Sequence, residues 1–161
     1  MKPKVYIETS VISYLTADVS ADLVIAARQY TTHRWWKGGR KEFDCFASRL
    51  VFQEASCGDP ELARRRLEII AEMPELAITK DVEELAEDLV TIGPLPRNAA
   101  NDAIHIAVAT VHGLDYLLSW NQKHIANIMM RDKVESTCRL RGYRPLAICT
   151  PDQLVEGLPD V

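Results

Sequence analysis

Short apolar runs alternate along this chain with longer segments in which apolar residues recur every three or four positions. The first pattern is typical of buried strands and the second of amphipathic helices. Strands are predicted at 4–7, 43–47, 76–79, 116–119 and 145–149. A first short helix is predicted to run through Leu15 after a cap at Thr9 or Ser10, and another from Asp81 to before Gly93. The other helices are predicted at 20–36, 50–55, 60–73, 98–111, 122–127 and 133–140, with a last helical turn at 151–155.

The order of these elements predicts the class of fold. Strands that alternate with helices form a parallel sheet whose two faces are both covered by helices. The expected fold is therefore α/β, with a central parallel sheet. No repeat, low-complexity tract or linker interrupts the pattern, and residues 1–161 are expected to form a single domain.

Composition and charge narrow the classes of function. No apolar run approaches the roughly 20 residues that cross a bilayer, and the N-terminus leads into the first strand without a signal-peptide pattern. Four separated cysteines without a Cys-x-x-Cys pair are typical of reduced thiols, so a cytoplasmic protein without membrane contact is expected. The formal net charge is −4, and a nucleic acid would therefore need a local basic patch or a bound metal.

Three acids occupy positions where an acid is unusual. Glu8 ends the apolar run of the first strand, Glu54 follows the apolar residues 50–52, and Asp102 opens a hydrophobic helix. Ligands of parallel sheets bind beyond the carboxyl ends of the strands. Because Asn121 follows the fourth strand, we expect all four residues to converge on that rim of the sheet.

Each acid also has a structural explanation. Glu8 could cap the next helix, Asp102 could complement a helix dipole, and Glu54 could pair with Arg49 or Arg97. Three unrelated structural acids at three such positions are a weaker explanation than one shared site. A carboxylate in apolar surroundings costs several kcal/mol unless a cation meets it, and oxygen ligands suit Mg²⁺ or Mn²⁺. The sequence therefore predicts metal-assisted hydrolysis of a phosphodiester as the chemistry of this rim.

Four segments in a fixed order carry a resemblance to a known family. They are residues 5–15 (VYIETSVISYL), 50–54 (LVFQE), 101–107 (NDAIHIA) and 117–121 (LLSWN). In this order and spacing, the chain resembles the PIN-domain family, particularly its VapC-type toxin relatives, from residue 4 to about residue 150.

The resemblance implies a three-layer α/β/α sandwich and cleavage of RNA that depends on Mg²⁺ or Mn²⁺. It implies catalytic roles for Glu8, Glu54, Asp102 and Asn121, with the three acids as the metal ligands. It also implies a homodimer and a cognate antitoxin protein. Two positions depart from the family pattern: Glu8 replaces an Asp, and Asn121 replaces an acid, so one bound metal is expected.

Other polar residues have two interpretations each. Ser10 and His105 are candidates for substrate binding, although Ser10 could instead hold a carboxylate and His105 could be structural. The basic and aromatic segment that includes Arg28, Trp35 and Trp36 could contact RNA, or its tryptophans could pack in the core or in a dimer contact. The competing function is a PIN-fold module that binds RNA or a protein partner with weak or no catalysis.

Overall fold

The computed structural model describes residues 1–155. Five strands are β1 (Lys4–Ile7), β2 (Asp44–Ser48), β3 (Glu75–Leu76), β4 (Tyr116–Leu118) and β5 (Ala147–Cys149). The α-helices are α1 (Thr9–Thr16), α2 (Leu23–Lys37), α3 (Arg49–Ala55), α4 (Pro60–Ile70), α5 (Lys80–Thr91), α6 (Ala100–Val111), α7 (Arg131–Leu140) and α8 (Pro151–Val155). Two 3₁₀ turns, η1 (Gly39–Glu42) and η2 (Arg97–Ala99), precede β2 and α6.

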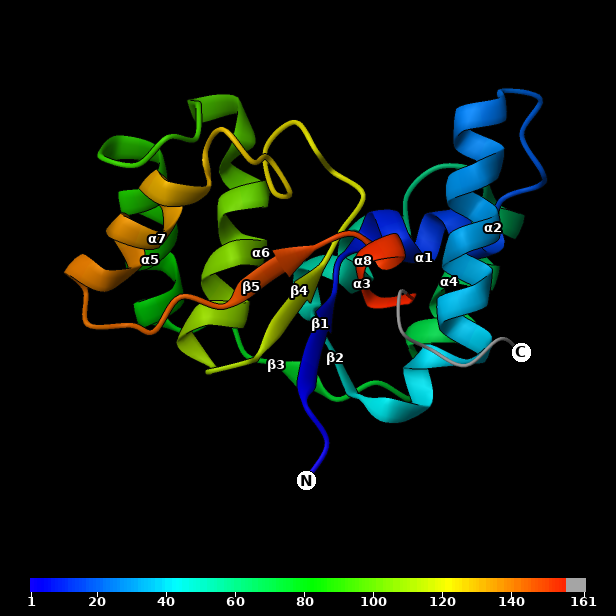
Figure 1. Ribbon diagram of the computed structural model, residues 1–161, viewed down its shortest axis with the longest axis horizontal. Coiled ribbons are helices and arrows are strands. Elements are labelled where there is room, and N and C mark those ends of the chain that lie inside the picture. The colour runs from blue at the N-terminus through cyan, green and yellow to red at the C-terminus, as the bar shows by residue number, and fades with distance from the viewer. Residues whose placement is uncertain (156–161) are drawn as a thin grey trace.

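The strands form one parallel sheet in the order β3-β2-β1-β4-β5. Helices α5, α6 and α7 lie on one side of the sheet, and α1, α2, α3, α4 and α8 lie on the other (Figure 1). The predicted α/β/α architecture with a central parallel sheet is confirmed. The chain order reverses at β1, which is the central strand, so the carboxyl end of β1 lies at the switch point where such folds bind ligands.

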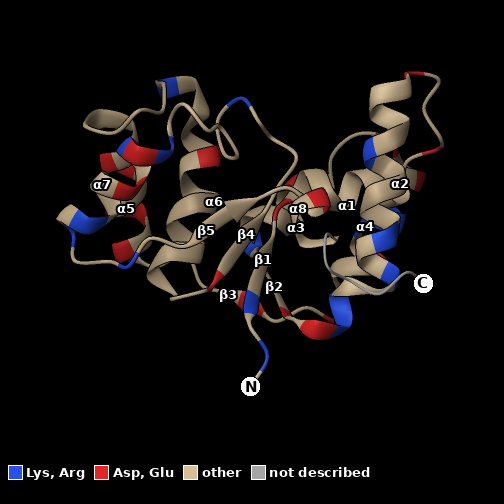
Figure 2. Cartoon of the chain, in the orientation of Figure 1, with Lys and Arg blue, Asp and Glu red and all other residues tan. Residues whose placement is uncertain are grey.

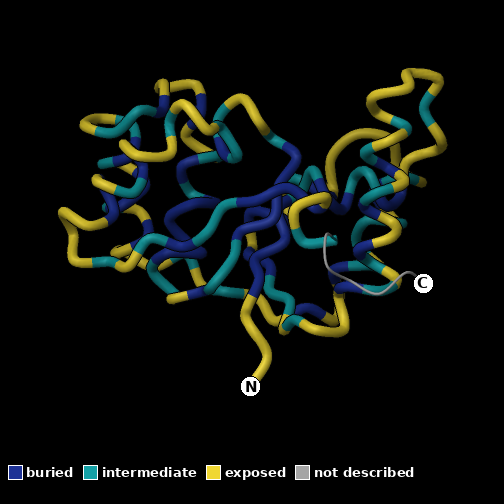
Figure 3. The backbone as a smooth tube through the Cα atoms, viewed as in Figure 1, coloured by how far each residue is buried: buried dark blue, intermediate teal, exposed yellow. Residues whose placement is uncertain are grey.

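The core follows from the apolar runs identified in the sequence. Val5, Tyr6 and Ile7 of β1 are fully buried, as are Leu117 and Leu118 of β4. Figure 3 shows this buried centre flanked by exposed outer turns of the helices. A strand covered on both faces needs a continuous apolar sequence, which explains why these runs do not alternate.

Helix limits follow from capping. Asp59 accepts hydrogen bonds from two N–H groups at the start of α4, and Pro60 occupies its first turn, as predicted. The N-cap of the first helix is Glu8, which accepts the N–H of Ser10. This confirms the alternative in which Glu8 caps the helix, and the cap predicted at Thr9 or Ser10 is wrong.

The short helix predicted at 122–127 is wrong. This segment is a series of turns, and the carbonyl oxygen of Asn121 accepts the N–H groups of both Ile125 and Ala126. The side-chain Oδ1 of Asn121 also accepts a hydrogen bond from the N–H of His124. The Ala126 N–H bonds the Asn121 carbonyl five residues back, at 2.7 Å, so the segment does not continue as an α-helix.

No helix among residues 1–155 has the length and apolar character that crossing a membrane requires.

Candidate functional site

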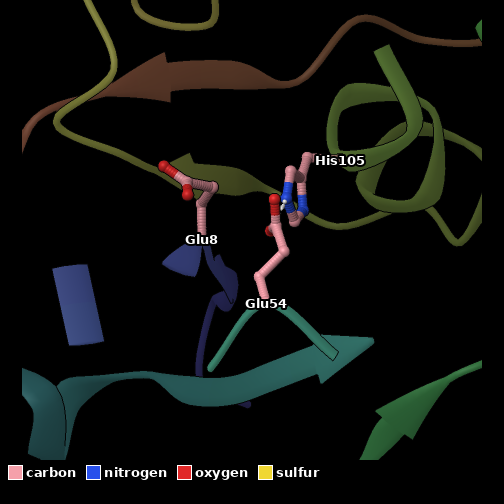
Figure 4. A group of neighbouring side chains, drawn as sticks. All are labelled: Glu8, Glu54 and His105. Carbon is pink, nitrogen blue, oxygen red and sulfur yellow. Dashed lines mark hydrogen bonds and ion pairs between the residues drawn. The ribbon is translucent and has the colours of Figure 1, made fainter. Parts of the chain in front are cut away.

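Two glutamates and a histidine meet at the carboxyl edge of the sheet. Glu8 follows β1, Glu54 lies on α3 and His105 lies on α6, and one ligand atom from each lies within 4.8 Å of the others. Figure 4 shows the Glu54 carboxylate facing the His105 ring, with Glu8 beside them. Three elements that are distant in sequence therefore supply one cluster.

Glu8 is a buried carboxylate that small polar groups hold in place. Its Oε2 accepts the backbone N–H of Ser10 at 2.8 Å. Its Oε1 accepts the hydroxyls of Ser10 at 2.6 Å and Ser119 at 2.5 Å. Among residues 1–155, no Lys or Arg forms an ion pair with Glu8, although the residue is only 6% exposed. A carboxylate buried in this way is held by neutral donors and remains a strong ligand for a cation.

Glu54 is joined to the same edge by different partners. Its Oε1 accepts the Thr9 hydroxyl at 2.7 Å and lies 2.6 Å from His105 Nε2. Burial alone would raise the pKa of Glu54, but the hydrogen bonds from His105 and from the Thr9 hydroxyl hold that pKa below its usual value. The alternative ion pair of Glu54 with Arg49 does not form, and Arg49 Nη1 lies 3.8 Å from Glu75 Oε1 instead. Glu54 is therefore ionised at neutral pH.

His105 is fixed from its other side by a buried chain of hydroxyls. Its Nδ1 lies 2.7 Å from the Tyr6 hydroxyl, which is hydrogen-bonded to Ser48 Oγ at 2.7 Å. Burial raises the pKa of Tyr6 far above its usual value, so this phenol keeps its proton. The ring of His105 is 1% exposed and cannot turn away from Glu54 without breaking both bonds.

Asp102 lies in the first turn of α6 and contacts the turns that follow β4. Asn121 Nδ2 donates to its Oδ1 at 3.1 Å, and His124 Nδ1 lies 3.0 Å from its Oδ2. The N–H of Asn121 donates to Ser119 Oγ, which in turn donates to Glu8. The structure thus brings Asp102 and Asn121 together and links them through Ser119 to Glu8, whereas the three-residue cluster contains His105 in place of Asp102.

The other candidates have defined positions. Ser10 Oγ donates to Glu8 and accepts the Trp120 N–H at 2.9 Å, so it connects the start of α1 to the end of β4. Trp35 is fully buried, which confirms packing rather than RNA contact for that ring. Trp36 packs against the core under the Arg40 guanidinium, at 4.2 Å. Arg28 lies nearer the site, 5.4 Å from the Trp120 ring centre.

Sequence reasoning missed the supporting side chains. Thr9, Ser48 and Ser119 are ordinary polar residues at strand or helix ends, and no pattern marks them as partners of an acid. His105 carried a signal, because it lies one helical turn after Asp102 on the same polar arc. That spacing did not show that His105 would face Glu54 while Asp102 faces Asn121.

Comparison with known proteins supports the class of fold. No protein-family model matches the sequence, and a comparison with curated protein sequences also gives no match. Among solved structures, the chain is similar to a chain in the crystal structure of VapBC2 from Rickettsia felis bound to a DNA fragment from their promoter. The identity is 15%, the TM-score is 0.53, and the match covers 91% of this chain and 97% of that chain.

The parallel sheet, its two helical layers and this similarity define an α/β/α protein with a PIN-like fold. At 15% identity, the likeness extends to the fold and not further.

Proposed function

We propose that this protein is a metal-dependent ribonuclease of the PIN-domain family that hydrolyses RNA phosphodiester bonds. The observation that carries the proposal is the convergence of Glu8 and Glu54 from separate elements at the switch point of the sheet. The fold shared with the VapBC2 chain supports the same class. The proposed cofactor is a single Mg²⁺ or Mn²⁺.

The donor set fits a hard divalent cation. Glu8, Glu54 and Asp102 would hold it through carboxylate oxygens, the ligands that Mg²⁺ and Mn²⁺ prefer. When bound, such a cation stabilises charge on a phosphate and increases the acidity of a water molecule. Asn121 supplies no charge, and its proposed role is to orient Asp102 through the 3.1 Å hydrogen bond.

The chain's own residues preorganise this edge. The Ser10 and Ser119 hydroxyls fix Glu8, and Thr9 fixes Glu54. Carboxylates that are already oriented lose little conformational freedom when a ligand binds.

RNA is proposed to approach from the side of α2. Arg28 donates to Gln122 at 2.8 Å, next to the turn that carries Asn121. Figure 2 shows Lys and Arg positions along α2 and α4, whereas α5 carries many acids. A basic side would offset the net charge of −4 where a phosphate must come close. Ser10 and His105 remain candidates for substrate contact.

RNA cleavage with Glu54→Gln and a matched control tests the proposal. The wild type should cleave RNA with Mg²⁺ or Mn²⁺ and lose this activity in EDTA, and Glu54→Gln should be inactive. Glu87→Gln, which changes an exposed glutamate on α5, should cleave like the wild type. Products should carry 5′-phosphate and 3′-hydroxyl ends, because water rather than the ribose 2′-hydroxyl is the proposed nucleophile. Cyclic phosphate ends, or equal cleavage by Glu54→Gln, would contradict the assignment.

The proposed biological role is the toxin of a toxin–antitoxin pair that acts in the cytoplasm as a homodimer. The similarity to a chain of the VapBC2 assembly motivates this role. Expression of the wild type should arrest bacterial growth, and Glu54→Gln should relieve the arrest. A cognate antitoxin protein should restore growth and copurify with the wild type. Light scattering during size exclusion should give the mass of a dimer.

One observation favours the alternative, a binding module without turnover. Glu54 and Asp102 already have partners within the chain, His105 for the first and Asn121 and His124 for the second. Such a module would bind RNA or a protein partner equally well in EDTA and would release no fragments. The cleavage assay with added Mn²⁺ distinguishes the two functions.

A further inference from the structure

We propose that His105 is a nitrogen ligand of the cation held by Glu8 and Glu54, so that the site combines oxygen and nitrogen donors. This inference rests on the proposed cation of the ribonuclease and adds a residue that an all-carboxylate site does not contain.

The position of the ring is the first argument. His105 Nε2 is directed at the Glu54 carboxylate at 2.6 Å, and a donor atom of Glu8 lies within 4.8 Å of both. Bonds from oxygen or nitrogen to a divalent metal are about 2.0–2.2 Å long, so a small separation of the ring and the carboxylate would admit a cation between them. Both oxygens of Asp102, in contrast, already face donors on the turns after β4.

The second argument is the chain of hydroxyls behind the ring. A carboxylate only accepts hydrogen bonds, so Nε2 carries the proton while it contacts Glu54, and Nδ1 then accepts the Tyr6 hydroxyl. In the other tautomer, Nδ1–H donates to the Tyr6 oxygen and the Tyr6 hydroxyl donates to Ser48. Nε2 then presents a lone pair to a cation. The net number of protons on these groups is the same in both arrangements.

Metal-binding histidines are usually fixed by a hydrogen bond at the nitrogen that does not bind the metal, which sets the tautomer and the ring orientation. Tyr6 and Ser48 supply that bond from inside the core. A ring that served only to hold Glu54 would have the same position, but it would keep its Nε2 proton when the cation binds. The two roles therefore differ in one measurable property, a nitrogen directly bonded to the metal.

Donor type predicts the preference among metals. Mg²⁺ is bound through oxygen ligands in near-ideal octahedral geometry, whereas Mn²⁺ is a first-row transition metal and also binds sites that contain nitrogen donors. A nitrogen ligand should therefore favour Mn²⁺ over Mg²⁺. Replacement of His105 by Gln should weaken Mn²⁺ binding about tenfold or more, as loss of a group that supports a metal site does, and should change Mg²⁺ binding less.

Pulsed electron paramagnetic resonance of bound Mn²⁺ tests the inference directly. The wild type, labelled with ¹⁵N-histidine, should show coupling between Mn²⁺ and an imidazole nitrogen. The chain has four histidines, so the single variants His33→Gln, His112→Gln and His124→Gln identify the source without altering the buried ring. All three should retain the coupling, and His105→Gln should lose it.

Three results would overturn the inference. Bound Mn²⁺ without nitrogen coupling would make His105 a hydrogen-bond partner of Glu54 only, and would leave the proposed ribonuclease standing. Loss of coupling in His124→Gln would assign the nitrogen to that residue. A wild type that binds no Mn²⁺ would overturn both this inference and the proposed cation. If His105→Gln does not fold, the wild type and the three other variants still decide the question.

Discussion

Replacement of Asn121 by Asp places two carboxylates side by side and tests how the site balances charge. Asn121 Nδ2 donates to Asp102 Oδ1 at 3.1 Å, and its Oδ1 is held by the His124 N–H. The new carboxylate could not donate to Asp102. Without a cation, the variant therefore loses a hydrogen bond to a charged acceptor and gains a repulsion.

The size of the effect follows from that geometry. Two unit charges about 3.5 Å apart repel by ~1 kcal/mol at the dielectric constant of water and by ~5 kcal/mol at a dielectric constant of about 20. The Asp102 side chain is 21% exposed, which favours an intermediate value. Protonation of one carboxyl would limit the repulsion at pH 7 to about 4 kcal/mol, and a lost hydrogen bond to a charged group adds about 1.5–3 kcal/mol. We expect the metal-free variant to lose roughly 5 kcal/mol of stability, which lowers Tm by about 10–20 °C.

A divalent cation should reverse this loss, because the additional charge strengthens its binding. Thermal unfolding in EDTA and in Mn²⁺, with calorimetric titration of Mn²⁺, measures both effects. Asn101→Asp is the matched control, since it adds the same charge at an exposed position next to Asp102 in the first turn of α6. Its Tm and Mn²⁺ affinity should change little. Lower pH should reduce the defect of Asn121→Asp, because the paired carboxyls have a raised pKa in the folded state and share a proton.

A metal-free Asn121→Asp variant as stable as the wild type would refute the hydrogen bond between Asn121 and Asp102 in solution. Equal or weaker Mn²⁺ affinity in the variant would place residue 121 outside the field of the cation. The proposed metal-binding region would then contain only Glu8, Glu54, Asp102 and His105.

Further predictions concern buried groups. Tyr6→Phe leaves the buried Nδ1 of His105 without a hydrogen-bond partner and should cost about 1–3 kcal/mol in urea unfolding; an unchanged midpoint would contradict that bond. Cys57 is exposed, whereas burial raises the pKa of Cys149 to about 12, so a disulfide reagent at pH 8 should modify Cys57 rapidly and Cys149 only on unfolding. The pKa of Glu54 is lower in the folded state, so its contribution to stability is complete above roughly pH 5 and is lost as pH falls through the folded pKa. Glu54→Gln should therefore show a smaller loss of stability between pH 6 and pH 3, and an identical acid profile would exclude this contribution.

The order of apolar runs and helix signals was sufficient to predict the class of fold. Continuous apolar strands such as 4–7 require cover on both faces, and strand–helix alternation allows a parallel arrangement. The sequence predicted the first and last residues of individual strands and helices less well. The third strand was expected at 76–79 but comprises only Glu75–Leu76, because this edge strand pairs with the last two residues of β2 alone.

Strand order was enough to predict that Glu8 and Asn121 lie at the carboxyl edge of the sheet, because the ends of parallel strands share one edge. Glu54 and Asp102 were expected beside them on helices α3 and α6. How the four residues pair depends on the tertiary structure. Helix periodicity places Asp102 and His105 on one arc, but the packing of α6 on α5 and β4 directs His105 to Glu54 and Tyr6. The turns at 121–127 form around Asn121 and give Asp102 its partners. Side-chain pairs between distant elements depend on how helices pack on the sheet, and local sequence does not contain that information.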